Sequence, residues 1–153
     1  MAILELLKAD HAKVKALLEE TLGTEDATVR NRLMKQIKTD LTAHSHAEEK
    51  VLYRRMEKSE DGKDEALEGD VEHELVLLLC EQLARSRSKA SDPWTARCTV
   101  LKELVEHHVE EEEGEFFKTA RKMFDRATLE RMGAEFIREK TRLGVPPLAE
   151  AAE

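Results

Sequence analysis

The chain has 153 residues, a length that fits one domain able to bury a full hydrophobic core. Charged residues make up 38% of it and aromatic residues 4%, a composition typical of helices with charged outer faces rather than of a sheet. The net charge of −8 argues against nucleic-acid binding, because proteins that bind nucleic acids usually carry basic patches.

Targeting and membrane segments are not visible in the sequence. The N-terminus lacks a basic region followed by a long apolar run, so we expect no signal peptide, and no stretch approaches the length of a membrane span. Cys80 and Cys98 show neither metal-binding nor redox spacing, and two cysteines are too few for a disulfide scaffold. We therefore expect a cytoplasmic protein that binds neither a nucleic acid nor a membrane.

The spacing of apolar residues predicts two long helices in the first half of the chain. The first covers residues 3–22, ends at Gly23 and carries an apolar stripe in which His11 fills a vacant position. The second covers about 27–58, after a short polar segment. Its inward row consists of Leu33, Ile37, Leu41, His44, Glu48 and Leu52.

The second half of the chain repeats this pair of helices. Segment 59–65 is predicted to be a loop, and the next helix covers about 66–84, with an inward row that begins at His73. After a polar break, Asp92 and Pro93 suit the start of the following helix, as an N-cap and a first-turn proline. The inward row of this helix consists of Leu101, Leu104, Val105, His108, Glu112 and Phe116.

A fifth helix is predicted over about 128–141, and Gly144 with the two prolines that follow ends it. We therefore expect one all-α domain over residues 1–145 and a flexible tail over 146–153. The fold class is an antiparallel up-down four-helix bundle with an additional C-terminal helix. The bundle consists of two helical hairpins, at about 3–58 and 66–124.

A motif with the spacing H-x3-E-E occurs twice, 64 positions apart. In a helix, residues four apart lie one above the other on the same face, so the imidazole stacks on the first carboxylate. An acidic residue followed by His precedes each motif, and this internal repeat supports the two similar hairpins. The repeated residues are Asp10-His11 with His44, Glu48 and Glu49, and Glu72-His73 with His108, Glu112 and Glu113.

The apolar stripes of the four helices include six His and Glu residues, whose side chains can bind metal and are expected to point toward the inside of the bundle. An isolated ionised carboxylate is costly to bury, so these groups need a common partner, which a pair of metal ions supplies. Neutral imidazoles and carboxylates suit iron, manganese or zinc, and each metal could take two imidazoles while both carboxylates bridge. The predicted ligands are His11, His44, Glu48, His73, His108 and Glu112.

Two other histidines are expected at the surface. His46 points to another side of its helix than His44. His107 also has a Glu four residues later, so spacing alone does not exclude it as a ligand. We prefer His108, because it continues the apolar row of its helix and matches His44 in the repeat.

Four further residues near the motifs receive weaker interpretations. Glu49 and Glu113 are expected as flanking carboxylates beside the ligands. Tyr53 falls outside the i, i+4 ladder and is expected to pack near the end of the bundle rather than to bind metal. Asp40 lies one turn before His44 on the same face, where it could orient an imidazole.

These motifs resemble those of the hemerythrin-like HHE cation-binding domains, in which each of four helices carries a His and the second and fourth carry H-x3-E-E segments. The resemblance covers about residues 4–117. It implies a carboxylate-bridged, oxo- or hydroxo-bridged di-iron centre held by the six residues named above, with zinc or manganese as substitutes. Such proteins are associated with oxygen carriage or sensing, iron handling and responses to peroxide or nitric oxide.

The chain departs from the oxygen-carrying hemerythrins at two points. Those proteins have a further His where this chain has Leu77, and their fourth helix uses H-x4-D where this chain has H-x3-E. One His fewer leaves a coordination position for solvent. The resemblance therefore implies a non-haem di-iron protein that reacts with peroxide in a catalase-like way, or binds oxygen or nitric oxide, in oxidative or nitrosative stress. The alternative is a non-enzymatic module that binds or senses oxygen, nitric oxide or iron; no protein partner is identified.

Overall fold

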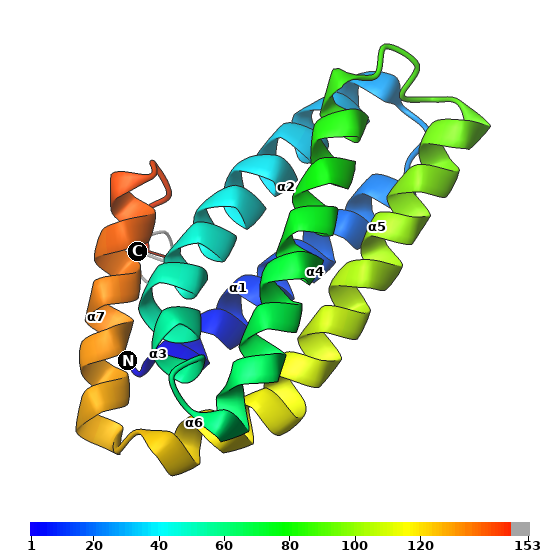
Figure 1. Ribbon diagram of the computed structural model, residues 1–153. Coiled ribbons are helices and arrows are strands. Elements are labelled where there is room, and N and C mark those ends of the chain that lie inside the picture. Colours follow the sequence, from blue (N-terminus) through cyan, green and yellow to red (C-terminus); the bar gives the residue numbers. More distant parts are fainter. Residues whose placement is uncertain (148–153) are drawn as a thin grey trace.

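The computed structural model describes residues 1–147, and the fold over these residues is all-helical. Four long helices form an antiparallel up-down bundle, which confirms the predicted fold class, and a further helix lies against the outside of the bundle (Figure 1). The bundle helices are α1 (Ile3–Leu22), α2 (Ala27–Glu48), α4 (Glu60–Arg85) and α5 (Asp92–Glu111), and the outer helix is α7 (Arg126–Arg142).

Residues 60–65 are helical, where the sequence predicts a loop over 59–65. Ser59 is the N-cap of α4, and its side chain accepts a hydrogen bond from the backbone N–H of Asp61. Two acidic residues in the first turn suit the positive end of the helix. A Cβ on Gly62 would lie 2.8 Å from the carbonyl oxygen of Met56, so this glycine lets α4 begin directly against the end of the preceding helix.

Two other helix starts differ from the predicted ones by one or two residues. The N-cap of α5 is Ser91 rather than Asp92, because the Ser91 side chain accepts a hydrogen bond from the backbone N–H of Trp94. The outer helix α7 begins at Arg126, because Asp125 caps it. Capping depends on which side chain turns back to the backbone, and neighbouring candidates are hard to separate by residue type alone.

Both helices that carry the H-x3-E-E motif contain a π-helical turn beside the first Glu of the motif. The predicted regular helix over 27–58 is therefore interrupted by η1. In a π-helix the backbone hydrogen bonds join residues five apart, so a side chain five positions after an inward residue also faces inward. The elements concerned are η1 (Glu49–Tyr53) with α3 (Arg54–Met56), and η2 (Glu112–Phe116) with α6 (Phe117–Met123).

The hydrophobic core is divided into two parts, and a polar layer separates them. On α1 the change from one part to the other falls between Leu7 and Val14, and on α2 it falls between Ala47 and Leu41. The side chains between these limits lie at the same level of the bundle, with apolar groups above and below. Polar groups in this layer are consequently shielded from bulk water.

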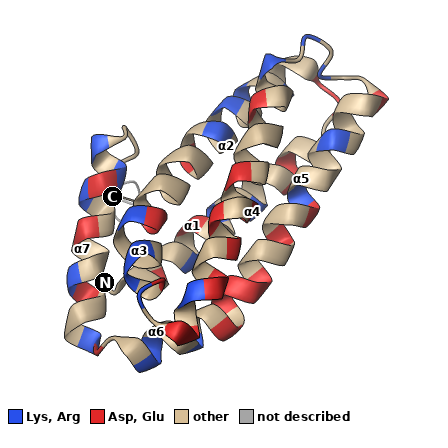
Figure 2. Ribbon diagram, in the orientation of Figure 1, with Lys and Arg blue, Asp and Glu red and all other residues tan. Residues whose placement is uncertain are grey.

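The charged residues lie mainly on the outer faces of the helices, and acidic residues gather where α5 ends (Figure 2). Over residues 1–147 no helix combines the length and the apolar character needed to cross a membrane. Of the predicted tail, 146–153, residues 148–153 lie outside the described part of the chain.

Candidate metal centre

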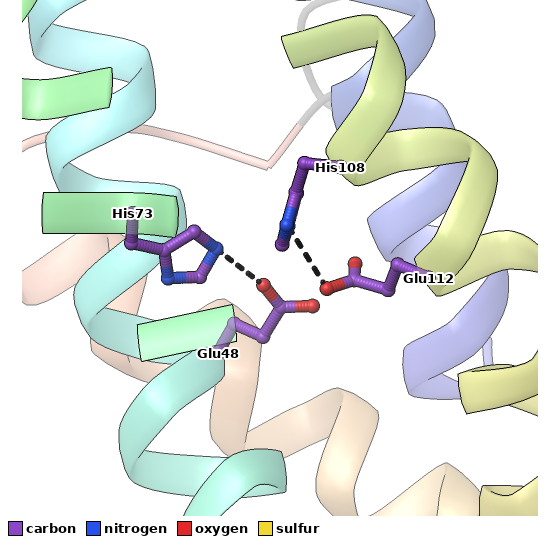
Figure 3. Close-up of side chains that lie close together, drawn as sticks. All are labelled: Glu48, His73, His108 and Glu112. Atoms are coloured by element: carbon purple, nitrogen blue, oxygen red, sulfur yellow. Dashed lines mark ion pairs between the residues drawn. The ribbon is translucent and has the colours of Figure 1, made fainter. Parts of the chain in front are cut away.

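Six buried side chains lie together in the polar layer, and they are the six that the sequence predicts as ligands. They form two groups that share Glu112, and within each group the nitrogen and oxygen atoms lie within 4.8 Å of one another. Each residue is at most 7% exposed. Figure 3 shows four of them reaching toward one another, Glu48 from α2, His73 from α4, and His108 and Glu112 from α5 and its π-helical end. The groups are Glu48, His73, His108 and Glu112, and His11, His44 and Glu112.

Each of the two inward carboxylates lies between imidazoles from different hairpins. Oε1 of Glu112 is 3.2 Å from Nε2 of His11, and its Oε2 is 3.1 Å from Nε2 of His108. A carboxylate with imidazole nitrogens on both sides occupies the position of a bridge between two cations. The corresponding distances from Oε1 of Glu48 are 3.1 Å to Nε2 of His73 and 3.5 Å to Nε2 of His44.

A carboxylate also holds the outer nitrogen of each of the four imidazoles. Nδ1 of His73 is 2.9 Å from Oε2 of Glu49, while its Nε2 faces the centre. Such a contact sets the ring orientation and the tautomer, so that Nε2 is available as a metal ligand. The other pairs are His11 with Glu113 at 2.7 Å, His44 with Asp10 at 2.9 Å, and His108 with Glu72 at 2.8 Å.

These orienting carboxylates stand next in sequence to the inward residues, which explains the repeated dipeptides. Asp10 directly precedes His11 but contacts His44 in the same hairpin. Glu49 directly follows Glu48 but contacts an imidazole of the other hairpin. The second half of the chain repeats both arrangements. Each dipeptide thus supplies one inward side chain and one carboxylate that orients an imidazole on a neighbouring helix.

The electrostatics of the centre favour bound positive charge. Burial lowers the pKa of His73, but its contacts with the carboxylates of Glu48 and Glu49 outweigh burial and raise the pKa to about 9. The pKa of His11 is raised to about 9 by the same balance of effects. Burial alone would raise the pKa of Glu112, yet two adjacent imidazoles hold it well below its usual value. The carboxylate of Glu112 therefore stays ionised and attracts cations.

The atoms that face the centre also fit a metal pair as a donor set. Several of them are buried without a hydrogen-bond partner in residues 1–147, and such atoms are costly to leave unpaired. Imidazole nitrogens and carboxylate oxygens together suit iron, manganese or zinc. The unpartnered atoms are Nε2 of His11, Nε2 of His44, both carboxylate oxygens of Glu48 and Oε1 of Glu112.

Tyr53 packs in the core as expected, but it also reaches the centre, which its place outside the i, i+4 ladder does not predict. Its side chain is almost fully buried, as expected for a packing residue. However, its hydroxyl donates a hydrogen bond of 2.5 Å to Oε2 of Glu112. The hydroxyl oxygen of Tyr53 also lies 3.5 Å from the Nε2 atoms of both His73 and His108.

The π-helical turn η1 explains why the position of Tyr53 was missed. Tyr53 stands five residues after Glu48, where a regular α-helix would turn it off the inner face, and η1 restores it. A Cβ on Gly69 would lie 2.7 Å from the tyrosine ring, so this glycine makes room for it. Phe117 has the equivalent place after Glu112 and is also buried. An aromatic residue at the same place in both repeats was therefore the available signal.

Three other polar residues lie away from the centre. His46 is exposed, and His107 is 62% exposed and pairs with Glu111 on its own helix. Asp40 contacts Lys13 and Gln36 instead of an imidazole, so its interpretation as an orienting residue is wrong. Asp10 of α1 orients His44 instead. Residue spacing within α2 does not reveal a partner that comes from another helix.

A pocket of about 360 Å³ reaches the centre between α4 and the end of α5. Its inner wall includes Tyr53, His108 and Glu112, and acidic side chains such as Glu68 and Glu115 line its outer part. The pocket is large enough for a small molecule to approach the atoms of the centre from outside.

Comparisons with known proteins agree with the residue pattern. A family model described as the hemerythrin HHE cation binding domain matches residues 2–120, which include the whole bundle but not α7. A protein from Nostoc sp. (strain PCC 7120 / SAG 25.82 / UTEX 2576) named DNA nickase is 31% identical over 143 residues. That match covers 94% of this chain but only 40% of the relative. No solved structure matched the chain.

Proposed function

Because the chain belongs to the hemerythrin HHE cation-binding family, we propose that it holds two iron ions in its polar layer and disposes of hydrogen peroxide. The observation that carries the proposal is the orientation of four imidazoles by four carboxylates, which turns each Nε2 toward Glu48 or Glu112. His11 and His44 would hold one ion and His73 and His108 the other, with Glu48 and Glu112 between them.

An iron pair, when bound, supplies two-electron redox chemistry, so that one peroxide molecule gains two electrons and two protons to give two waters and a second loses them to give dioxygen. The chain's own residues supply access and proton positions. The pocket beside His108 admits a small neutral molecule. The hydroxyl of Tyr53 holds its proton in a hydrogen bond of 2.5 Å to Oε2 of Glu112, at the inner end of that pocket. The apolar layers on both sides exclude bulk water.

The absence of a further His also supports turnover over reversible oxygen carriage. Position 77, four residues after His73, is a leucine and offers no ligand atom. A metal ion held by His73 and His108 would lack a protein ligand from this position, which solvent or peroxide could take. Stable adducts with oxygen or nitric oxide, formed without turnover, would replace this proposal by the second candidate, a binding or sensing module.

The decisive experiment compares neighbouring histidines on the same helix. Protein purified without chelators should contain about two irons per chain and release oxygen from hydrogen peroxide, as measured by metal analysis and with an oxygen electrode. His108→Ala should lose metal and oxygen release, while His107→Ala keeps both. His44→Ala and His46→Ala form the matched pair on α2. Metal loss in His107→Ala with retention in His108→Ala would refute the assignment.

Metal analysis of the same preparation also decides among iron, manganese and zinc, which the donor set accepts alike. Small molecules are the proposed partners. The name of the Nostoc relative belongs to a protein of which this chain covers 40%, so the lack of nucleic-acid binding stays a prediction, checked by a gel-shift assay with DNA. A cytoplasmic location is also a proposal, supported by two cysteines that are free and buried.

A further inference from the structure

The outer face of α4 carries a continuous apolar stripe that nothing in residues 1–147 covers. Its members recur at intervals of four, four and three residues, so they share one face of the helix. Their exposed fractions run from 43% to 54%, large for such side chains in a monomer. Val100 on α5 and Met1 are the other exposed large apolar residues of the described chain. The stripe consists of Leu67, Val71, Leu75 and Leu78.

The ends of the stripe differ in charge. On the same helical face, Glu60 and Asp64 precede the apolar residues, and Gln82 and Arg85 follow them. Arg85 is 80% exposed, and its contact in residues 1–147 is Glu81 on its own helix. The face therefore runs from an acidic end, through an apolar middle, to an end with a cation and an amide.

We propose that this face binds a second copy of the same chain, with the two α4 helices antiparallel about a twofold axis near residue 73. This register places Val71 against Leu75 of the other copy, so the apolar middles coincide. It also brings Arg85 of each copy to Glu60 of the other, and Gln82 to Asp64. A parallel pairing would set the acidic ends against each other, which like-charge repulsion disfavours.

A groove beside the stripe fits the same register. It has a volume of about 450 Å³, lies between α4 and α5, and includes Leu67 and Val71 in its wall together with His107. In the antiparallel arrangement, Leu78 of the other copy lies over this groove. Each copy thus offers an apolar knob at one end of the stripe and a groove at the other, as a self-complementary twofold interface requires.

The first experiment measures the mass of the full chain by sedimentation over a range of concentrations. Wild-type protein should shift from monomer to dimer, and Val71→Glu combined with Leu75→Glu should stay monomeric at every concentration. Val100→Glu is the control, since Val100 is equally exposed but lies outside the stripe, and it should dimerise like wild type. A wild-type chain that remains monomeric, or a dimer that survives the double substitution, overturns the proposal. If the double variant loses helix by circular dichroism, Leu75→Gln replaces it.

A second experiment tests the antiparallel register. Arg85→Glu should weaken the dimer at least tenfold, and adding Glu60→Arg should restore it. Mixing Val71→Cys protein with Leu75→Cys protein should give a cross-linked pair on mild oxidation, faster than either variant alone. Faster cross-linking of each variant with itself would indicate a parallel pairing and overturn the proposed arrangement. Metal content is measured on every variant, and an unchanged value keeps this outcome separate from that of the metal centre.

Discussion

At the scale of single residues, Tyr53 is the group whose role the structure changes most. Its ring stacks on His73, with the ring centroids 5.2 Å apart, and its hydroxyl reaches Glu112. Burial, and then the charges of Glu112 and Glu48, raise its pKa well above the usual value, so in the metal-free protein the hydroxyl keeps its proton and donates a hydrogen bond to the carboxylate of Glu112.

Tyr53→Phe should therefore keep the fold but change the centre. The phenylalanine ring fills the same space, so the helix content should not change. Glu112 loses a hydrogen-bond donor, which for a charged acceptor costs about 1.5–3 kcal/mol, so the melting temperature should fall by several degrees. We expect slower oxygen release from peroxide and a changed visible spectrum of the iron-loaded protein. Phe117→Leu, which alters the equivalent residue without a hydroxyl, is the control. Identical spectra and rates in wild type and Tyr53→Phe would contradict this role.

The orienting carboxylates make a second prediction at the same scale. Glu49→Gln removes the negative charge that lies beside Nδ1 of His73 but leaves a side chain of the same size. Loss of such a partner usually lowers metal affinity about 10–100-fold, because the imidazole becomes less basic and less well oriented. Competition with a chelator measures this affinity. Glu111→Gln, which changes a carboxylate paired with the exposed His107, should leave the affinity unchanged.

At the scale of elements, α7 is tied to the centre through one buried ion pair. Nζ of Lys140 lies 2.7 and 2.6 Å from the two carboxylate oxygens of Asp10, which orients His44. The other three orienting carboxylates have no Lys or Arg contact of this kind in residues 1–147. The two halves of the centre are therefore electrostatically unequal, and a helix outside the family match causes the difference.

Lys140→Met should consequently act on stability and on the electronic properties of the centre. Removing one partner of a buried pair costs about 3–5 kcal/mol, less here because His44 still contacts Asp10. An unneutralised Asp10 also makes His44 a stronger donor, so the reduction potential of the iron-loaded protein should fall. Denaturant unfolding and spectroelectrochemistry measure the two effects.

Two variants separate charge from packing in this experiment. Lys140→Arg keeps the positive charge and should restore most of the potential. Lys50→Met breaks the exposed ion pair between Lys50 and Glu139, a residue of α7 like Lys140. This variant should change neither the stability nor the reduction potential appreciably. A potential that is the same in Lys140→Met and wild type would show that α7 only packs against the bundle.

At the scale of the whole molecule, the metal is expected to be a part of the core. Without it, carboxylates and imidazoles face one another between two apolar layers. A metal that binds only the native state adds about 2.7 kcal/mol at a free concentration of 100 times its dissociation constant, roughly 5–10 °C in melting temperature for a chain of this size.

The metal-free protein should therefore keep most of its helix but melt at a lower temperature, as calorimetry with and without iron would show. Glu48→Ala combined with Glu112→Ala removes the two inward carboxylates, and the melting temperature of this variant should hardly respond to iron. Equal melting of the wild-type protein with and without a full complement of metal would mean that these side chains do not form a metal-supported core.

The sequence by itself determined the helices and the faces they bury, because the period of apolar residues is a local property of the chain. The repeat also selected His108 over His107, and the six side chains it turns inward do lie together. Helix ends were less well determined. At the start of α4, Ser59 favours a helix as its N-cap, whereas the nearby Gly62 favours a loop.

Only the tertiary structure decided which residues meet across helices. Asp10 rather than Asp40 orients His44, since the contact depends on how α1 packs against α2. Tyr53 enters the centre through a π-helical turn, which changes the register by one residue and leaves no mark in apolar spacing. Lys140 reaches Asp10 from 130 residues away. Periodicity fixes the direction of a side chain from its own helix, whereas its partners follow from the packing of all the helices together.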